Sequence, residues 1–133
     1  VMAQVFNRFE QETPLTEGDV SALALLAPTL RMQLVYETRV PHLLTHPFFN
    51  IWAEVDMTAV QALAIEAVDH RYLANEDELF LPETDSRQAF YLIKGKLIYV
   101  QMPDTARVRD RTETSVHPGA WISEAALWSH WTQ

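Results

Sequence analysis

The sequence contains no cysteine, and this absence excludes several kinds of chemistry. Disulfide scaffolds, cysteine-ligated zinc sites and thiol nucleophiles all require a residue that the chain lacks, although the cellular compartment is not fixed by this. Basic residues are also few, because ten Lys and Arg stand against 18 Asp and Glu and leave a net charge of −8. That balance argues against binding to nucleic acid or to an anionic membrane patch.

Long apolar runs are missing as well. The longest covers only residues 22–27, whereas a helix that crosses a bilayer needs about 20 apolar residues. The N-terminal residues show no apolar segment of the kind found in a signal peptide. Because the chain begins with Val1 rather than Met, we expect it to be a soluble piece of a longer protein. Its 133 residues, 48% of them hydrophobic, suffice for one domain with a core.

The first half of the sequence has the spacing of helices. A capping pattern at Thr16 predicts a helix over residues 16–27, and Pro28 fits the first turn of a second helix that ends before Pro41. A short piece from His42 to His46 is then closed by Pro47. Thr58 opens a further capping box, and the apolar face that follows it predicts a helix over residues 58–68, with these positions on one side: Val60, Leu63, Ala64, Ala67 and Val68.

The second half alternates between polar and apolar residues, which predicts strands. Residues 78–81 form a short candidate strand, and residues 89–94 and 96–100 flank Gly95 as the two arms of a β-hairpin. Residues 103–112 are polar and predict a loop, and residues 113–116 predict one more strand. Because helices come first and antiparallel strands follow, the predicted fold class is α+β.

Histidines and carboxylates offer candidate chemical sites. His42 and His46 have the i, i+4 spacing of a two-histidine metal face, but Pro47 breaks the helix and no third ligand is evident, which favours structural roles. The alternating Arg107, Arg109 and Arg111 indicate a salt-bridged surface rather than an anion site. A metal-dependent cupin would need two histidines one residue apart on a strand, and the sequence has none. We therefore expect no catalytic residues, no metal site and no enzymatic activity.

The stretch HPGAWISEAALW, residues 117–128, is the most informative candidate site. It places one carboxylate, Glu124, within a run of small and apolar residues that follows the turn at Gly119. If residues 119–127 form a turn and a short helix, the backbone amides at its start lack intrahelical partners and suit an anion such as a phosphate. Glu124 would be free to accept a hydrogen bond from a polyol. The alternative is a simple amphipathic turn with Trp121, Leu127 and Trp128 in the core.

Together these motifs resemble a cyclic nucleotide-binding domain. Tyr91, Ile93 and Gly95 are similar to the family's hairpin motif, in which a tyrosine is followed by an apolar residue, an isoleucine and then a glycine. A second set is similar to the family's phosphate-binding cassette: Gly119, Glu124, Ala126 and Leu127. The lead-in APTLRMQL at residues 27–34, with the later PHLL and HPFF, is similar to the C-linker of cyclic-nucleotide-gated, hyperpolarisation-activated and ether-à-go-go-like channels. The resemblance covers residues 6–128.

The resemblance implies a helical C-linker-like segment over residues 1–55 and a partial β-roll (jelly roll), incomplete at its C-terminus, over residues 56–133. It implies a site for cAMP or cGMP in which Glu124 accepts the ribose 2′-hydroxyl and the amides of Ser123, Glu124, Ala125 and Ala126 meet the phosphate, after the turn at Gly119. No other cofactor is expected. The implied partners are the cyclic nucleotide, a transmembrane pore domain of the same polypeptide and the other subunits of a homotetramer, on the cytoplasmic side of a membrane.

Two hypotheses follow from these residues. In the first, the chain is the regulatory module of a potassium or non-selective cation channel and couples cyclic nucleotide binding to the pore. In the second, it is an interaction module that binds no nucleotide. Two departures motivate the second: Ser123 stands where the family has glycine, and no Arg or Lys follows Arg111, whereas the family cassette continues to an arginine that pairs with the phosphate.

Overall fold

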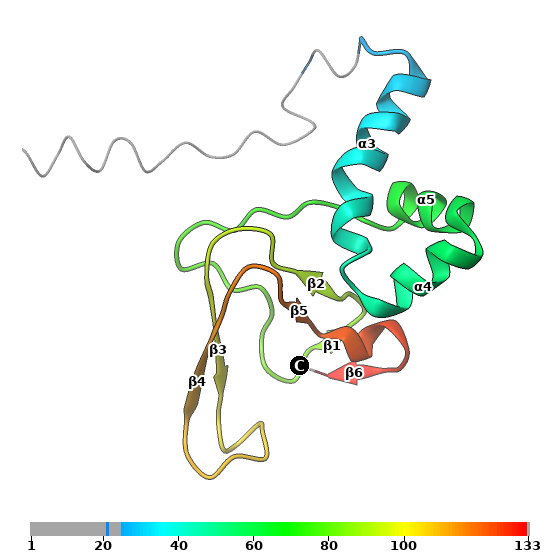
Figure 1. The fold of residues 1–133 in the computed structure, drawn as a ribbon. Coiled ribbons are helices and arrows are strands. Elements are labelled where there is room, and N and C mark those ends of the chain that lie inside the picture. Colours follow the sequence, from blue (N-terminus) through cyan, green and yellow to red (C-terminus); the bar gives the residue numbers. More distant parts are fainter. Residues whose placement is uncertain (1–20, 22–24, 133) are drawn as a thin grey trace, which may run out of the picture.

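The computed structural model describes residues 21 and 25–132. From residue 25 on, the described residues form three α-helices followed by short antiparallel strands (Figure 1), so the α+β class is confirmed for this part of the chain. The helix predicted for residues 16–27 falls largely outside the described residues. No helix in the described part is both long and apolar enough to cross a membrane.

Helix α3 spans Pro28–Leu43 and tests two predictions, that Pro28 lies in its first turn and that it ends before Pro41. Pro28 lies in its first turn, as predicted. The predicted end before Pro41 is wrong, because the helix continues through this residue to Leu43. Pro41 lacks the N–H that would bond the carbonyl four residues earlier. The neighbouring Val40 and Leu43 are both buried in the core, and their packing holds the last turn in a helical conformation.

Helices α4 (Pro47–Val55) and α5 (Met57–Glu66) follow with tight connections. The prediction that Pro47 closes the piece from His42 to His46 is wrong. Pro47 instead opens α4, in the first-turn position that suits its fixed φ. The cap of α5 is Asp56 and not Thr58, because the Asp56 carboxylate accepts the Ala59 N–H at 3.0 Å. A carboxylate at this position satisfies an amide that has no intrahelical partner.

The three helices enclose the core of the described structure. Its buried hydrophobic residues come from all three helices: Val40, Leu43, Phe49, Val60 and Ala64. The predicted face of α5 is confirmed in part: Val60 and Ala64 are fully buried and Leu63 packs against them, whereas Ala67 follows the helix and is exposed. Trp121, from the strand half of the chain, packs against this cluster and ties the two halves together.

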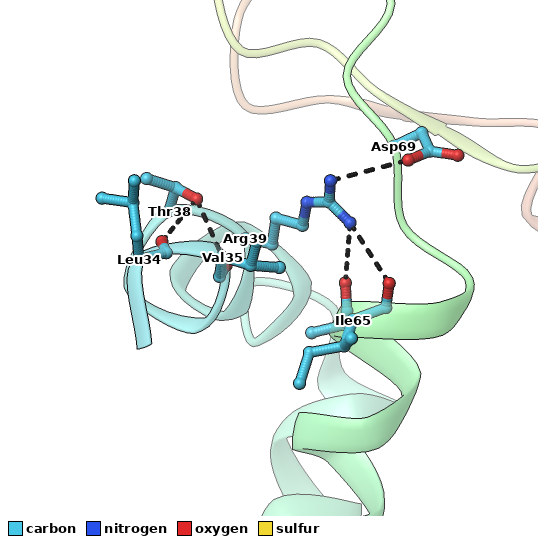
Figure 2. Close-up of polar contacts among 7 residues, drawn as sticks. Leu34, Val35, Thr38, Arg39, Ile65 and Asp69 are labelled. Carbon is cyan, nitrogen blue, oxygen red and sulfur yellow. Dashed lines mark hydrogen bonds and ion pairs between the residues drawn. The ribbon is translucent and has the colours of Figure 1, made fainter. Parts of the chain in front are cut away.

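Arg39 joins α3 to the end of α5 (Figure 2). Its guanidinium Nη1 donates to the carbonyls of Ala64 and Ile65, at 3.3 and 3.4 Å, and Nη2 lies 3.6 Å from the Asp69 carboxylate. The last carbonyls of a helix lack intrahelical donors, and a cation also complements the negative end of the helix dipole. A buried arginine therefore caps the neighbouring helix.

The strands form three antiparallel pairs that differ from the predicted pairing. The pairs are β1 (Asp85–Ser86) with β6 (Trp131–Thr132), β2 (Phe90–Tyr91) with β5 (Trp121–Ile122), and β3 (Leu97–Gln101) with β4 (Thr112–Val116). The β3–β4 pair extends away from the helices (Figure 1).

Two sequence predictions in this half are wrong. The arms on either side of Gly95 do not pair with each other, because β2 pairs with β5 and β3 pairs with β4. Gly95 nevertheless has the predicted positive φ, +94°, and turns the chain between β2 and β3. Residues 78–81 form no strand, since Pro82 follows them and ladder pairing begins only at Asp85. The loop ahead of β4 and the strand at residues 113–116 are confirmed.

Candidate functional site

The turn at Pro118–Gly119 is fixed by backbone hydrogen bonds to the end of β2. The Gly119 N–H donates to the Leu92 carbonyl at 2.8 Å, and the Leu92 N–H donates to the Ala120 carbonyl at 3.0 Å. Gly119 has a φ of +93°, which glycine adopts without steric cost. Strand β5 follows at once, so this turn and its pairing with β2 set the direction in which the chain enters residues 123–127.

The turn and short helix predicted for residues 119–127 are present only in part, because residues 121–122 form β5 and the short helix occupies only the end of this range. Ser123 has φ +60° and ψ +32°, in the left-handed region, and a 3₁₀ helix, η2, runs over Glu124–Leu127. A non-glycine residue in this conformation carries a steric penalty from its Cβ. The Ala126 N–H donates to the Ser123 carbonyl at 3.0 Å. Of the four amides predicted to meet a phosphate, the one of Ala126 is therefore already engaged within the turn.

The Glu124 carboxylate is half exposed and lies against His46. Glu124 Oε2 is 3.2 Å from His46 Nε2, across a sequence separation of 78 residues. The second ring nitrogen, Nδ1, accepts the Phe48 N–H at 3.2 Å and thereby caps α4. Since Nδ1 accepts this hydrogen bond, the proton of a neutral ring resides on Nε2, and this N–H donates to Glu124.

Aromatic rings surround the His46 imidazole, which is only 7% exposed. The ring centroids of Trp121, Phe49 and Trp128 lie 5.1, 5.2 and 6.2 Å from that of His46, and Trp121 meets it edge-on. Such aromatic pairs contribute beyond their buried area. The imidazole therefore contacts three aromatic rings, and this packing, together with its two hydrogen bonds, sets its orientation toward Glu124.

A second polar contact lies beside the first. Trp121 Nε1 donates to Thr45 Oγ1 at 2.9 Å, and the Thr45 hydroxyl donates to the His42 carbonyl at 2.7 Å. We refer to the pair of contacts His46–Glu124 and Thr45–Trp121 as the helix–turn contact. It joins the connection between α3 and α4 to two residues within the candidate cassette, Trp121 and Glu124.

Four of the five predicted site residues lie in one turn, and Gly119 lies before it, on the other side of β5. Ser123, Ala125 and Ala126 are partly buried, whereas Gly119 is exposed at the preceding bend. The structure shows that Glu124 has a partner, His46, to which the sequence analysis assigned only a structural role. One signal was available, because a polar residue directly before a first-turn proline is a typical helix cap, and His46 precedes Pro47.

His42 and the three alternating arginines are the remaining candidates from the sequence. The His42 ring lies against the Tyr91 ring, with centroids 5.7 Å apart. Within the described residues no group of three or more potential ligands could hold a metal ion. Of the three arginines in the predicted salt-bridged surface, Arg111 forms an ion pair with Glu113, whereas Arg107 and Arg109 form none with the described residues.

Comparison of the chain with protein-family models, with curated proteins and with solved structures gave no match. The interpretation of the site therefore depends on its residues and geometry.

Proposed function

We propose that the chain is a cytoplasmic regulatory module of a cyclic nucleotide-regulated cation channel. In this proposal the helices correspond to a C-linker, the strands belong to a cyclic nucleotide-binding β-roll of the jelly-roll type, and Gly119 to Ala126 form its phosphate cassette. The helix–turn contact is the observation that carries the proposal, because it supplies a direct physical connection between the candidate ligand site and the helical segment.

The shared carboxylate of Glu124 gives a mechanism for coupling. A ribose hydroxyl that donates to Glu124 would compete with, or reorient, the hydrogen bond from His46 Nε2. Because His46 also caps α4, a change at its ring alters the start of that helix. A ligand shifts a conformational equilibrium only through a difference in its contacts with the two states, and this shared contact is such a difference. In the intact protein the helices would pass the bias to the pore domain of a tetramer.

A second candidate function is an interaction module that binds no nucleotide. Two observations favour it: the Ser123 side chain occupies the family's glycine position, and the Ala126 amide is engaged within the turn. In this case the His46–Glu124 contact is a permanent part of the fold, and the cassette serves only to connect the strands with the helices.

Calorimetric titration with cAMP and with cGMP separates these two functions. If the chain is a nucleotide sensor, we expect a micromolar dissociation constant for one of them, and Glu124→Ala to weaken it about tenfold, the effect of a lost hydrogen bond to a charged group. Glu78→Ala is the control, because Glu78 is an exposed carboxylate in a different segment of the chain, between α5 and β1. Absence of heat with both nucleotides would refute the sensor function and leave the interaction module.

A further inference from the structure

A large groove is lined in part by Trp121, the residue that also takes part in the helix–turn contact. It has a volume of about 1750 Å³ and runs between helix α3, residues 67–73 after α5, and residues 87–97 around β2 and the Gly95 turn. Pockets for small molecules usually measure about 300–1,000 Å³. The size of this open groove suits a polypeptide segment better than a single small ligand.

The charge of the groove is opposite to that of the protein. Six of the ten basic residues of the chain line it, but only two of the 18 acidic residues, Glu37 and Asp69, do so. The lining thus has a formal charge of +4, whereas the rest of the sequence has a charge of −12. Arg39 is excluded from the available cations because it is buried at the end of α5 beside Asp69.

Four of the exposed cations are available for a partner. Within the described part of the chain, no carboxylate lies at ion-pair distance from these side chains: Arg71, Arg87, Lys94 and Lys96. All four cations lie around the same concavity. Opposite charge on a partner would steer its approach and fix its register.

Apolar side chains lie between these cations. Leu34 and Ile93 are exposed to 39% and 44%, and Phe90 and Leu97 are half buried along the same groove. Apolar surface rimmed by polar groups is typical of interaction sites. The occupant should therefore present both carboxylates and apolar side chains.

We propose that this groove binds an acidic peptide segment with interspersed apolar residues. Its carboxylates would meet Arg71, Arg87, Lys94 and Lys96, and its apolar side chains would cover Leu34 and Ile93. A flat bilayer cannot enter a concave groove, and the strongly negative remainder of the chain repels an anionic membrane or a nucleic acid. The proposal uses neither Glu124 nor His46, so its outcome is independent of the nucleotide site.

Fluorescence polarisation with a labelled peptide of alternating Glu and Leu residues tests the proposal. We expect saturable binding that weakens at least about tenfold in the double variant Lys94→Glu/Lys96→Glu. The matched control is Arg107→Glu/Arg109→Glu, which makes the same charge change at exposed residues outside the groove, and we expect it to alter the dissociation constant less than about twofold. The same peptide with Gln in place of Glu should bind at least about tenfold more weakly.

Three results would overturn the proposal. Equal weakening by the two double variants would mean that binding follows net charge alone. Absence of saturable binding would leave the groove without this ligand class. Binding to vesicles of phosphatidylserine and phosphatidylcholine in place of the peptide would assign the cations to a membrane. Because all four substituted residues are exposed, each variant is expected to keep the wild-type circular dichroism spectrum.

Discussion

Replacement of His46 separates the two hydrogen bonds that its ring makes. His46→Ala removes both the cap of α4 and the contact with Glu124. His46→Asn keeps a side-chain oxygen that can accept the Phe48 N–H, since Asn is among the best capping residues. The Asn side chain is too short to reach Glu124. Both variants therefore lose the hydrogen bond with Glu124, and they differ mainly in whether the cap of α4 is kept.

The expected magnitudes follow from the burial of each group. Loss of the cap costs about 1 kcal/mol, and loss of the hydrogen bond to a half-exposed carboxylate costs about 1 kcal/mol after solvent screening. Removal of the ring from among Phe49, Trp121 and Trp128 adds about 1–2 kcal/mol. We expect His46→Ala to lower the free energy of unfolding by about 3–4 kcal/mol, and His46→Asn by about 1 kcal/mol less.

Urea unfolding followed by tryptophan fluorescence measures these differences, because Trp121 and Trp128 both contact His46. A double-mutant cycle of His46→Asn with Glu124→Ala isolates the contact between the two side chains, and we expect a coupling energy of about 1 kcal/mol. A coupling energy below about 0.3 kcal/mol would refute the hydrogen bond as a stabilising contact. Equal destabilisation by His46→Ala and His46→Asn would refute the role of His46 as a cap.

Three further predictions concern the fold. Val60→Ala should lower the free energy of unfolding by about 2 kcal/mol in the same urea experiment, because Val60 is fully buried. The control is Val55→Ala in the adjacent helix, where the side chain is 81% exposed, and it should change the free energy of unfolding by less than about 0.5 kcal/mol. At position 123, with its left-handed backbone, Ser123→Gly should be about 1 kcal/mol more stable than Ser123→Ala, and the reverse order in chemical denaturation would contradict that conformation. Arg39→Lys should lower the free energy of unfolding by about 2 kcal/mol, since a lysine cannot reproduce the forked contacts with Ala64, Ile65 and Asp69. A melting temperature equal to that of the wild type would show that the cap on α5 contributes nothing to stability.

Local rules predicted the parts of the fold that depend on neighbouring residues. The apolar spacing after Thr58 identified the face of α5 that buries Val60 and Ala64, and Gly95 and Gly119 both adopt the positive φ expected of turn glycines. Pro28 begins a helix for the same local reason. In each case the information lies within about one turn of the chain, where steric and capping preferences act directly.

Contacts between distant segments could not be predicted in this way. The strands on either side of Gly95 alternate as a hairpin would, yet each pairs with a strand that lies further along the chain. Burial of Val40 and Leu43 overrides the local preference against a helix through Pro41. The partnership of His46 with Glu124 spans 78 residues, and no residue pattern near either one indicates it.

The proposed function holds that the Glu124 carboxylate accepts a hydrogen bond either from His46 or from a nucleotide, and the affinity of the His46→Asn variant tests this competition most directly. If ligand binding must displace the His46 hydrogen bond from Glu124, its removal should tighten the binding of cAMP or cGMP by about fivefold, the equivalent of 1 kcal/mol. Calorimetric titration of the wild type and this variant gives the comparison. A dissociation constant that is unchanged or weaker in His46→Asn would contradict the coupling of the ligand site to the helices through this contact.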